Sequence, residues 1–169
     1  FERIGDLSLV NTKYVSSVST DKHSIKITAN KNIDILSQVE NADFIVKLNG
    51  EEIQISSITL IDGSRSFVIS IANEINPGDI IQVSYIGDGI RSVDGLLLDI
   101  FNLETVDNTI SYVHKIPGKI EAEHYYFQKG ISLENSSDEG GGKNIGSLDD
   151  GDYADYMVNI NSAGTYNVT

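Results

Sequence analysis

Short runs in which polar and apolar residues alternate constrain the fold of this chain more than any other feature. Residues two apart on a strand point to the same face of a sheet, so an alternation of period two predicts strands with one buried face. The clearest runs lie at residues 13–19, 23–29, 44–48, 66–71 and 80–86. Because Asn, Asp and Gly separate these runs and the chain has only 2 prolines, we predict an all-β protein.

Turn residues indicate how the strands of the first half follow one another. Asn49-Gly50 predicts a type I′ hairpin turn, because both residue types tolerate the positive φ values that this turn requires. A further strand is predicted over residues 51–61, and Pro77-Gly78-Asp79 and Gly87-Asp88-Gly89 mark later turns. Seven short strands at this spacing predict an immunoglobulin-like β-sandwich.

The segment after these strands carries a more specific pattern, S-x-D-G-x-x-L-x-x-F, which follows a strand that ends in V-S-Y. This pattern resembles the Ig-like modules that follow catalytic domains in bacterial polysaccharide-degrading enzymes, and the resemblance covers residues 12–110. We expect Asp94-Gly95 to form a turn, and Leu96, Leu98 and Phe101 to pack the bottom of the sandwich. The resemblance implies that this half is a spacer.

A second proline beside a glycine, within residues 112–118, predicts a junction between domains. We therefore expect a first domain over residues 1–113 and a second over residues 114–169. The chain begins Phe-Glu-Arg, with no initiator Met and no signal-peptide pattern, so we expect it to be an internal piece of a longer polypeptide.

The charge balance removes several classes of partner. The 25 acidic residues outnumber the 12 basic ones, and the net charge of -13 disfavours nucleic acids and anionic membranes. No apolar stretch approaches the roughly 18 residues of a membrane helix, and there is no cysteine for a disulfide or a thiolate site. We expect a monomer that binds neither nucleic acid nor membrane.

The second half contains five ordered motifs, IPGKIEAEHY, GISLE, SDEGGGKNIG, DDGDYADYMVNIN and AGTY, over residues 116–166. In this order they resemble the N-terminal part of a carbohydrate-binding module of family 6. The resemblance covers residues 116–169 and implies the first third to half of a β-jelly-roll sandwich. It also implies a secreted or cell-surface protein that binds a polysaccharide or oligosaccharide.

Glu121 and Glu123 are candidate metal ligands. On a strand, two such carboxylates point to the same face and can converge on a hard cation, which prefers oxygen ligands. The resemblance implies a structural calcium here, completed by a carbonyl of the glycine-rich turn and by a ligand beyond Thr169. The alternative is a solvated Glu-x-Glu pair on an exposed strand.

Three residues are candidates for binding the sugar. The resemblance implies that Glu134 hydrogen-bonds sugar hydroxyls and that the position of a stacking aromatic is taken by Ser147, which removes one wall of the cleft. Tyr153 can supply a ring instead, as can the aromatics at 125–127, although packing in the core is the favoured role of Tyr153 and Tyr156. Because Ser147 replaces the stacking aromatic of the family pattern, three alternatives are open. The module binds through another surface, it binds a bulkier or charged sugar, or it has lost binding.

Other chemistries fail on detail. The acidic run 149–155 lacks the ligand spacing of an EF-hand and is expected to be a solvated turn. The three histidines have no Ser or Cys partner in a recognisable nucleophile elbow, and the glycines at 140–142 lack the first half of a phosphate-binding loop.

These observations predict a non-catalytic polysaccharide-binding region of a secreted bacterial glycoside hydrolase, which holds its attached catalytic domain on plant or algal glycans by tethering. A structural spacer or cell-surface module without glycan binding is the alternative. Catalysis by the chain itself has the least support.

Overall fold

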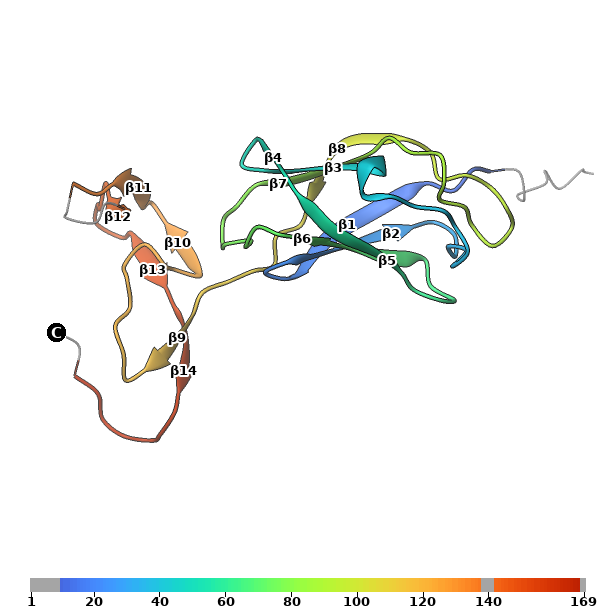
Figure 1. The fold of residues 1–169 in the computed structure, drawn as a ribbon. Coiled ribbons are helices and arrows are strands. Elements are labelled where there is room, and N and C mark those ends of the chain that lie inside the picture. Colours follow the sequence, from blue (N-terminus) through green and yellow to red (C-terminus); the bar gives the residue numbers. More distant parts are fainter. Residues whose placement is uncertain (1–9, 138–141, 168–169) are drawn as a thin grey trace, which may run out of the picture. The chain divides into compact units, whose positions relative to one another are not determined.

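The computed structural model describes residues 10–137 and 142–167, and nearly all of its regular structure is β-strand (Figure 1). The chain divides into two compact units, Phe1–Ile110 and Ser111–Thr169. The sequence-based boundary after residue 113 differs from this division, because it cuts strand β9 (Val113–Ile116), which pairs within the second unit. Among the described residues, no helix is long and apolar enough to cross a membrane.

The first unit is a β-sandwich of two four-stranded antiparallel sheets. The strands of the first sheet, in spatial order, are β1 (Tyr14–Asp21), β2 (Ser24–Ala29), β6 (Ser66–Ile71) and β5 (Ile55–Leu60). Those of the second are β4 (Glu51–Ile53), β3 (Phe44–Leu48), β7 (Ile81–Tyr85) and β8 (Phe101–Val106). A 3₁₀ turn, η2 (Asn41–Asp43), precedes β3.

Alternation of period two buries one face of each sheet. On β2 and β6 every second residue is buried, and these side chains form one hydrophobic core with residues of β3, β7 and β8. The rings of Phe44, Phe67, Tyr85 and Phe101 meet at its centre. Burial raises the pKa of Tyr85, whose hydroxyl accepts a hydrogen bond of 3.0 Å from the Ile90 amide. This interior confirms the all-β prediction.

The predicted hairpin turn is confirmed, since Asn49 and Gly50 have φ values of 53° and 90° and Leu48 pairs with Glu51. Leu98 and Phe101 are buried as predicted. The prediction of one strand over residues 51–61 is wrong. The strand is interrupted at Gln54. Before it, β4 pairs with β3 in one sheet, and after it, β5 pairs with β6 in the other.

The first and last strands of the first unit lie side by side and run parallel. The Ser19 amide donates to the Asp107 carbonyl at 2.9 Å, and the Asp107 amide donates to the Ser17 carbonyl at 2.9 Å. A second parallel bridge joins Thr12 to Leu98. These contacts connect the two sheets along one side of the sandwich.

The second unit is also all-β, but its described strands form three two-stranded sheets. Strand β9 pairs in parallel with β14 (Met157–Ile160). The antiparallel pairs are β10 (Phe127–Lys129) with β13 (Tyr153–Asp155), and β11 (Ser132–Asn135) with β12 (Lys143–Gly146). Residues 138–141 of the predicted glycine-rich loop lie outside the described residues. Among the described residues of this unit, Ile131 is the only buried hydrophobic side chain.

Candidate functional site

The hairpin of β11 and β12 brings together most of the residues predicted to bind sugar. Ser132 pairs with Gly146 and Glu134 pairs with Asn144, so Ser132, Glu134 and Gly146 share one face. The Glu134 carboxylate lies against Gly146, in the space that a β-carbon on residue 146 would need. A glycine at this position therefore lets an exposed carboxylate lie across the hairpin.

Ser147 follows Gly146 directly after β12. Its φ of 56° is in the left-handed region, which few residues other than glycine adopt readily. The hydroxyl of Ser132 donates to the hydroxyl of Ser147 at 3.0 Å. Two hydroxyls and one carboxylate thus belong to this hairpin, and we call their positions the hairpin site (Ser132, Glu134, Gly146 and Ser147). In it, Glu134 and Ser147 are exposed and Ser132 is half-buried.

Tyr153 lies on a different pair of strands. It pairs with Lys129 across β10 and β13, and its ring centroid is 6.1 Å from that of Phe127. The side chain is 45% exposed, so the favoured prediction of core packing is wrong for Tyr153. The interactions that the structure describes for Tyr153 include neither Glu134 nor Ser147. The ring is nevertheless exposed enough to stack on a sugar face.

Tyr156 has a different role from Tyr153. It is half-buried, and its hydroxyl donates to the Ala122 carbonyl at 2.8 Å. Burial raises the pKa of this phenol. The hydrogen bond joins the start of β14 to the turn that contains the two candidate metal ligands.

Glu121 and Glu123 lie in a turn, closed by a 3.0 Å hydrogen bond from the His124 amide to the Glu121 carbonyl, and not on the strand expected from the sequence. Among the described residues, IEAEH pairs with no strand. The Lys119 ammonium lies 2.6 Å from the Glu121 carboxylate and holds the pKa of that carboxyl below its ordinary value. Both carboxylates are donors of the kind that calcium prefers. Within the described part of the chain, however, no third acidic or histidine side chain joins them.

Sequence reasoning missed a ring cluster in the second unit. The rings of Tyr112 and His124 stack with centroids 4.0 Å apart, and Nε2 of His114 lies 2.8 Å from the His124 carbonyl oxygen. Tyr156 contacts His114 edge-on, with centroids 6.0 Å apart. Tyr112 and His114 are two residues apart, but His124 and Tyr156 follow His114 by 10 and 42 residues, so no local pattern could have grouped all four. The cluster joins β9 to the turn at residues 121–124.

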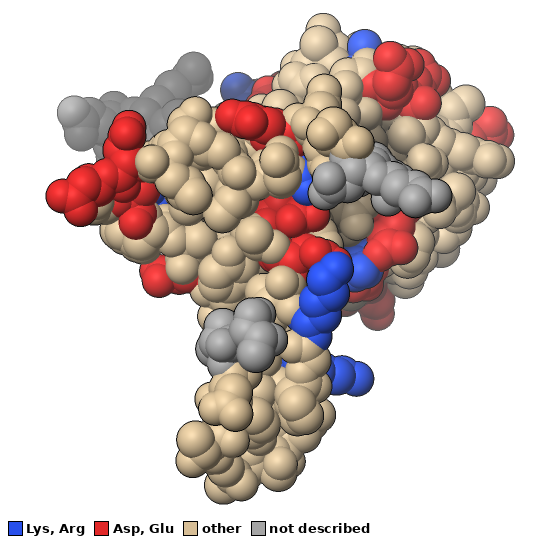
Figure 2. All heavy atoms as spheres, turned by 90° about the vertical axis from the view of Figure 1, so that its left-hand side faces the viewer, with Lys and Arg blue, Asp and Glu red and all other residues tan. Residues whose placement is uncertain are grey.

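The first part of the acidic run forms a solvated turn as predicted, in which the Asp149 amide donates to the Asp152 carboxylate at 2.8 Å, but Asp155 lies on β13 and not in the turn. Charge is unevenly distributed over the second unit. Figure 2 shows Asp and Glu spread over much of the surface in view, but none over the tan part that β9 and β14 form. Residues 111–118 and 156–167 contain no acidic residue, and Val113, Met157, Val158 and Ile160 are exposed there.

Comparison with known families and structures places these observations in context. The model of the family "Carbohydrate binding module (family 6)" matches residues 121–169, within the second unit, and supports a non-catalytic carbohydrate-binding module there. A comparison with curated proteins finds no match.

Solved structures similar to this chain include those of the S-layer protein SbsC. The N-terminal part of SbsC is 14% identical with a TM-score of 0.48, over 89% of this chain and 44% of that one. Domains 1–6 of SbsC are 14% identical with a TM-score of 0.52, over 93% and 27%. The S-layer protein rSbsC(31-844) is 16% identical with a TM-score of 0.51, over 86% and 22%. The chain therefore spans less than half the length of each structure, and at these identities the likeness concerns the fold alone.

Proposed function

We propose that the second unit binds polysaccharide through the hairpin site, and that the chain is an ancillary region of a secreted glycoside hydrolase that it holds on its substrate. The match of residues 121–169 to a carbohydrate-binding family carries this proposal. The hairpin site supplies the chemistry. The Glu134 carboxylate accepts hydrogen bonds from sugar hydroxyls, and Ser132 and Ser147 can donate or accept.

Tyr153 supplies the apolar half of the recognition. A pyranose ring presents C–H groups on its faces, and an exposed tyrosine ring packs against them while its hydroxyl stays in contact with water. Because Ser147 has no ring, stacking in this chain depends on Tyr153 rather than on the residue after Gly146. We infer that each site binds sugar more weakly than a site with two stacking rings would. Stable attachment to a polysaccharide then depends on several linked contacts.

The experiment compares the full chain with two variants. Wild type, Glu134→Gln and Glu52→Gln are titrated by calorimetry with xylan, β-glucan and agar oligosaccharides. Glu52 lies exposed on β4 of the first unit and serves as the matched control. We expect Glu134→Gln to weaken binding about tenfold, because a charged acceptor becomes neutral, and Glu52→Gln to have no effect. Absence of binding by wild type to all three glycans would contradict the proposal.

The alternative function, a structural spacer, is favoured by one observation, the absence of a stacking ring at Ser147. It predicts no glycan binding under any condition. The titration therefore separates the two functions, because only the binding module gives a signal that Glu134→Gln removes.

We further propose that calcium binds at Glu121 and Glu123, with ligands in addition to these two. Because Lys119 already pairs with Glu121, calcium must displace this ammonium. Lys119→Gln is therefore expected to strengthen calcium binding, measured by calorimetry in metal-free buffer. Lys129→Gln, which removes a charge elsewhere in the same unit, is the control. Equal calcium binding by wild type and Lys119→Gln would count against this site.

A further inference from the structure

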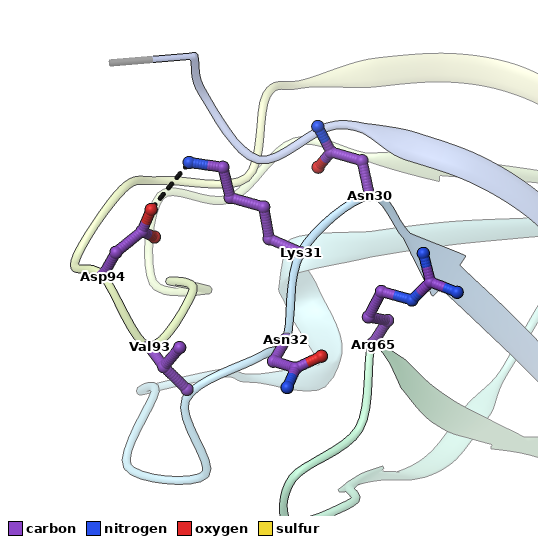
Figure 3. Close-up of a pocket in the computed structure, with 6 residues that line it drawn as sticks. All are labelled: Asn30, Lys31, Asn32, Arg65, Val93 and Asp94. Carbon is purple, nitrogen blue, oxygen red and sulfur yellow. Dashed lines mark hydrogen bonds and ion pairs between the residues drawn. The ribbon is translucent and has the colours of Figure 1, made fainter. Parts of the chain in front are cut away.

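The first unit contains a polar pocket of about 370 Å³ that the proposed function does not use. Figure 3 shows the side chains around it, which come from three separate segments. They are Asn30, Lys31, Asn32, Arg65, Val93 and Asp94. Five of these six side chains are exposed and Lys31 is half-buried, so the pocket is an open depression in the surface.

Backbone hydrogen bonds fix the three segments relative to one another. The Ala29 amide donates to the Arg65 carbonyl and the Ile33 amide to the Ser64 carbonyl, both at 2.8 Å. The Val93 amide donates to the Asn32 carbonyl at 3.0 Å. Because these bonds belong to a sandwich with a buried core, the pocket exists before any ligand arrives, which lowers the ordering cost of binding.

The charges within the pocket do not cancel. Lys31 and Asp94 form an ion pair of 2.7 Å, visible in Figure 3, and this ammonium lowers the pKa of the Asp94 carboxyl. The pair is therefore neutral as a unit. The Arg65 guanidinium makes no hydrogen bond or ion pair with any described residue, and neither does the side-chain amide of Asn32. The pocket thus carries one net positive charge in a chain whose net charge is -13.

We propose that this pocket binds a carboxylate-bearing sugar unit of an acidic polysaccharide. The planar guanidinium of Arg65 matches a carboxylate with two parallel hydrogen bonds. Asn32, which also lines the pocket, offers a donor and an acceptor to a ring hydroxyl. Val93, which is 68% exposed, provides an apolar contact for a C–H face of the ring.

The choice of a sugar over other carboxylates rests on the proposed function, because a carbohydrate-binding module lies in the same chain. The overall negative charge opposes long-range attraction of a polyanion. At about 0.15 M ionic strength, charges beyond roughly 8 Å are largely screened, so the Arg65 guanidinium dominates the electrostatic interaction with a carboxylate in the pocket. Two glycan sites on one chain also raise the effective concentration of the second contact.

The test titrates the full chain with tetragalacturonate at about 0.15 M salt and without calcium, following the amides of residues 30–33 and 92–94 by NMR. Three variants are compared: Arg65→Gln, Arg65→Lys and, as a control, Lys47→Gln. Lys47 lies on β3 in the other sheet and makes no described side-chain bond. Because the Arg65 side chain is exposed and unpaired, all three are expected to melt at the temperature of wild type.

We expect Arg65→Gln to weaken binding at least about tenfold, Arg65→Lys to weaken it less, and Lys47→Gln to leave it unchanged. The methyl ester of tetragalacturonate, which keeps the rings but loses the charge, is expected not to bind. Acetate, which has the charge but no ring, is expected not to compete. Binding that survives Arg65→Gln, or acetate that competes as well as the sugar, would overturn the proposal.

The second unit is tested separately in the same samples. Glu134→Gln leaves tetragalacturonate binding at the Arg65 pocket unchanged if the two sites are independent. Wild type that binds tetragalacturonate at the Arg65 pocket but binds no neutral glycan would refute only the hairpin site. Wild type that binds neutral glycans but not tetragalacturonate would refute only the pocket.

Discussion

The two units have the same secondary structure but differ in what their strands enclose. In the first unit, 18 described hydrophobic side chains are buried in one core between two four-stranded sheets. In the second, the described residues include one such side chain, Ile131, and the strands form three pairs. The difference teaches that alternating strands hydrogen-bond readily, whereas burial requires a second sheet to face them.

The comparison also separates stability from recognition. Each apolar side chain removed from water contributes on the order of 1.5–3 kcal/mol, so the first unit holds most of the hydrophobic stabilisation. The hairpin site of the second unit instead exposes Glu134 and Ser147. The predictions below test this contrast in order of decreasing effect.

Hydrogen exchange is expected to show the largest contrast. Amides of β6 and β7 lie in the middle of four-stranded sheets, whereas those of β11 and β12 belong to a two-stranded hairpin. Local opening is therefore easier in the hairpin, and we expect its amides to exchange about a thousandfold faster or more. Equal protection in the two units, measured by NMR, would break the comparison.

The same substitution in each unit gives the next largest effect. Phe67 is 0% exposed and Phe127 is 53% exposed. Phe67→Ala is expected to lower the free energy of unfolding by about 3–5 kcal/mol, since it leaves a cavity in the core. Phe127→Ala is expected to lower it by less than about 1 kcal/mol. Urea denaturation followed by far-UV circular dichroism measures both, and similar losses would contradict the contrast.

A smaller effect concerns the hairpin site alone. Gly146→Ala places a methyl group where the Glu134 carboxylate lies, so this side chain must move away. We expect an unfolding free energy within about 1 kcal/mol of wild type, because the displaced group is the end of a flexible, exposed chain. Glycan binding is expected to fall as far as in Glu134→Gln. Gly164→Ala, at a position with space for a methyl group, is the control and should bind normally.

The smallest effect compares one ion pair from each unit. Lys31 lowers the pKa of Asp94 and Lys119 lowers that of Glu121, so each pair is fully formed at neutral pH and is lost as the pH falls through the lowered pKa. The Lys119 side chain is 81% exposed and the Lys31 side chain 19%. Salt therefore screens the Lys119 pair more effectively.

NMR titration of the carboxyl carbons tests this expectation. Between about 0.05 and 0.5 M salt, the pKa of Glu121 should rise further toward 4.5 than that of Asp94 rises toward 3.8. Lys119→Gln should raise the pKa of Glu121 and leave that of Asp94 in place. If the pKa of Glu121 changes neither with salt nor with this substitution, Lys119 does not lower it.

Local patterns predicted what depends on local geometry. The turn at Asn49-Gly50 and the buried positions of β2 and β6 follow from φ preferences and from period two, which act within a few residues. The break at Gln54 could not be predicted, because the alternation continues through it and only the identity of the partner strand changes.

The candidate site shows the same limit. Glu134 and Ser147 lie together because a hairpin pairs nearby residues. Glu121 and Glu123 were expected on a strand but lie in a turn. A local residue pattern does not indicate whether a partner strand is present. The pocket at Arg65 joins three segments that lie 33 and 28 residues apart along the chain, and no spacing in the sequence indicates that they meet.

The parallel contact between β1 and the segment after β8 has a mechanical consequence. The chain enters the first unit through β1 and leaves through β8, and the hydrogen bonds of Ser17 and Ser19 to Asp107 lie across these two ends. A pull on the two ends stretches these bonds in shear, all at once, rather than opening them one by one. We therefore expect the first unit to resist a pull on its two ends better than a unit whose terminal strands unzip, with a lifetime under load set by the rate of forced unfolding.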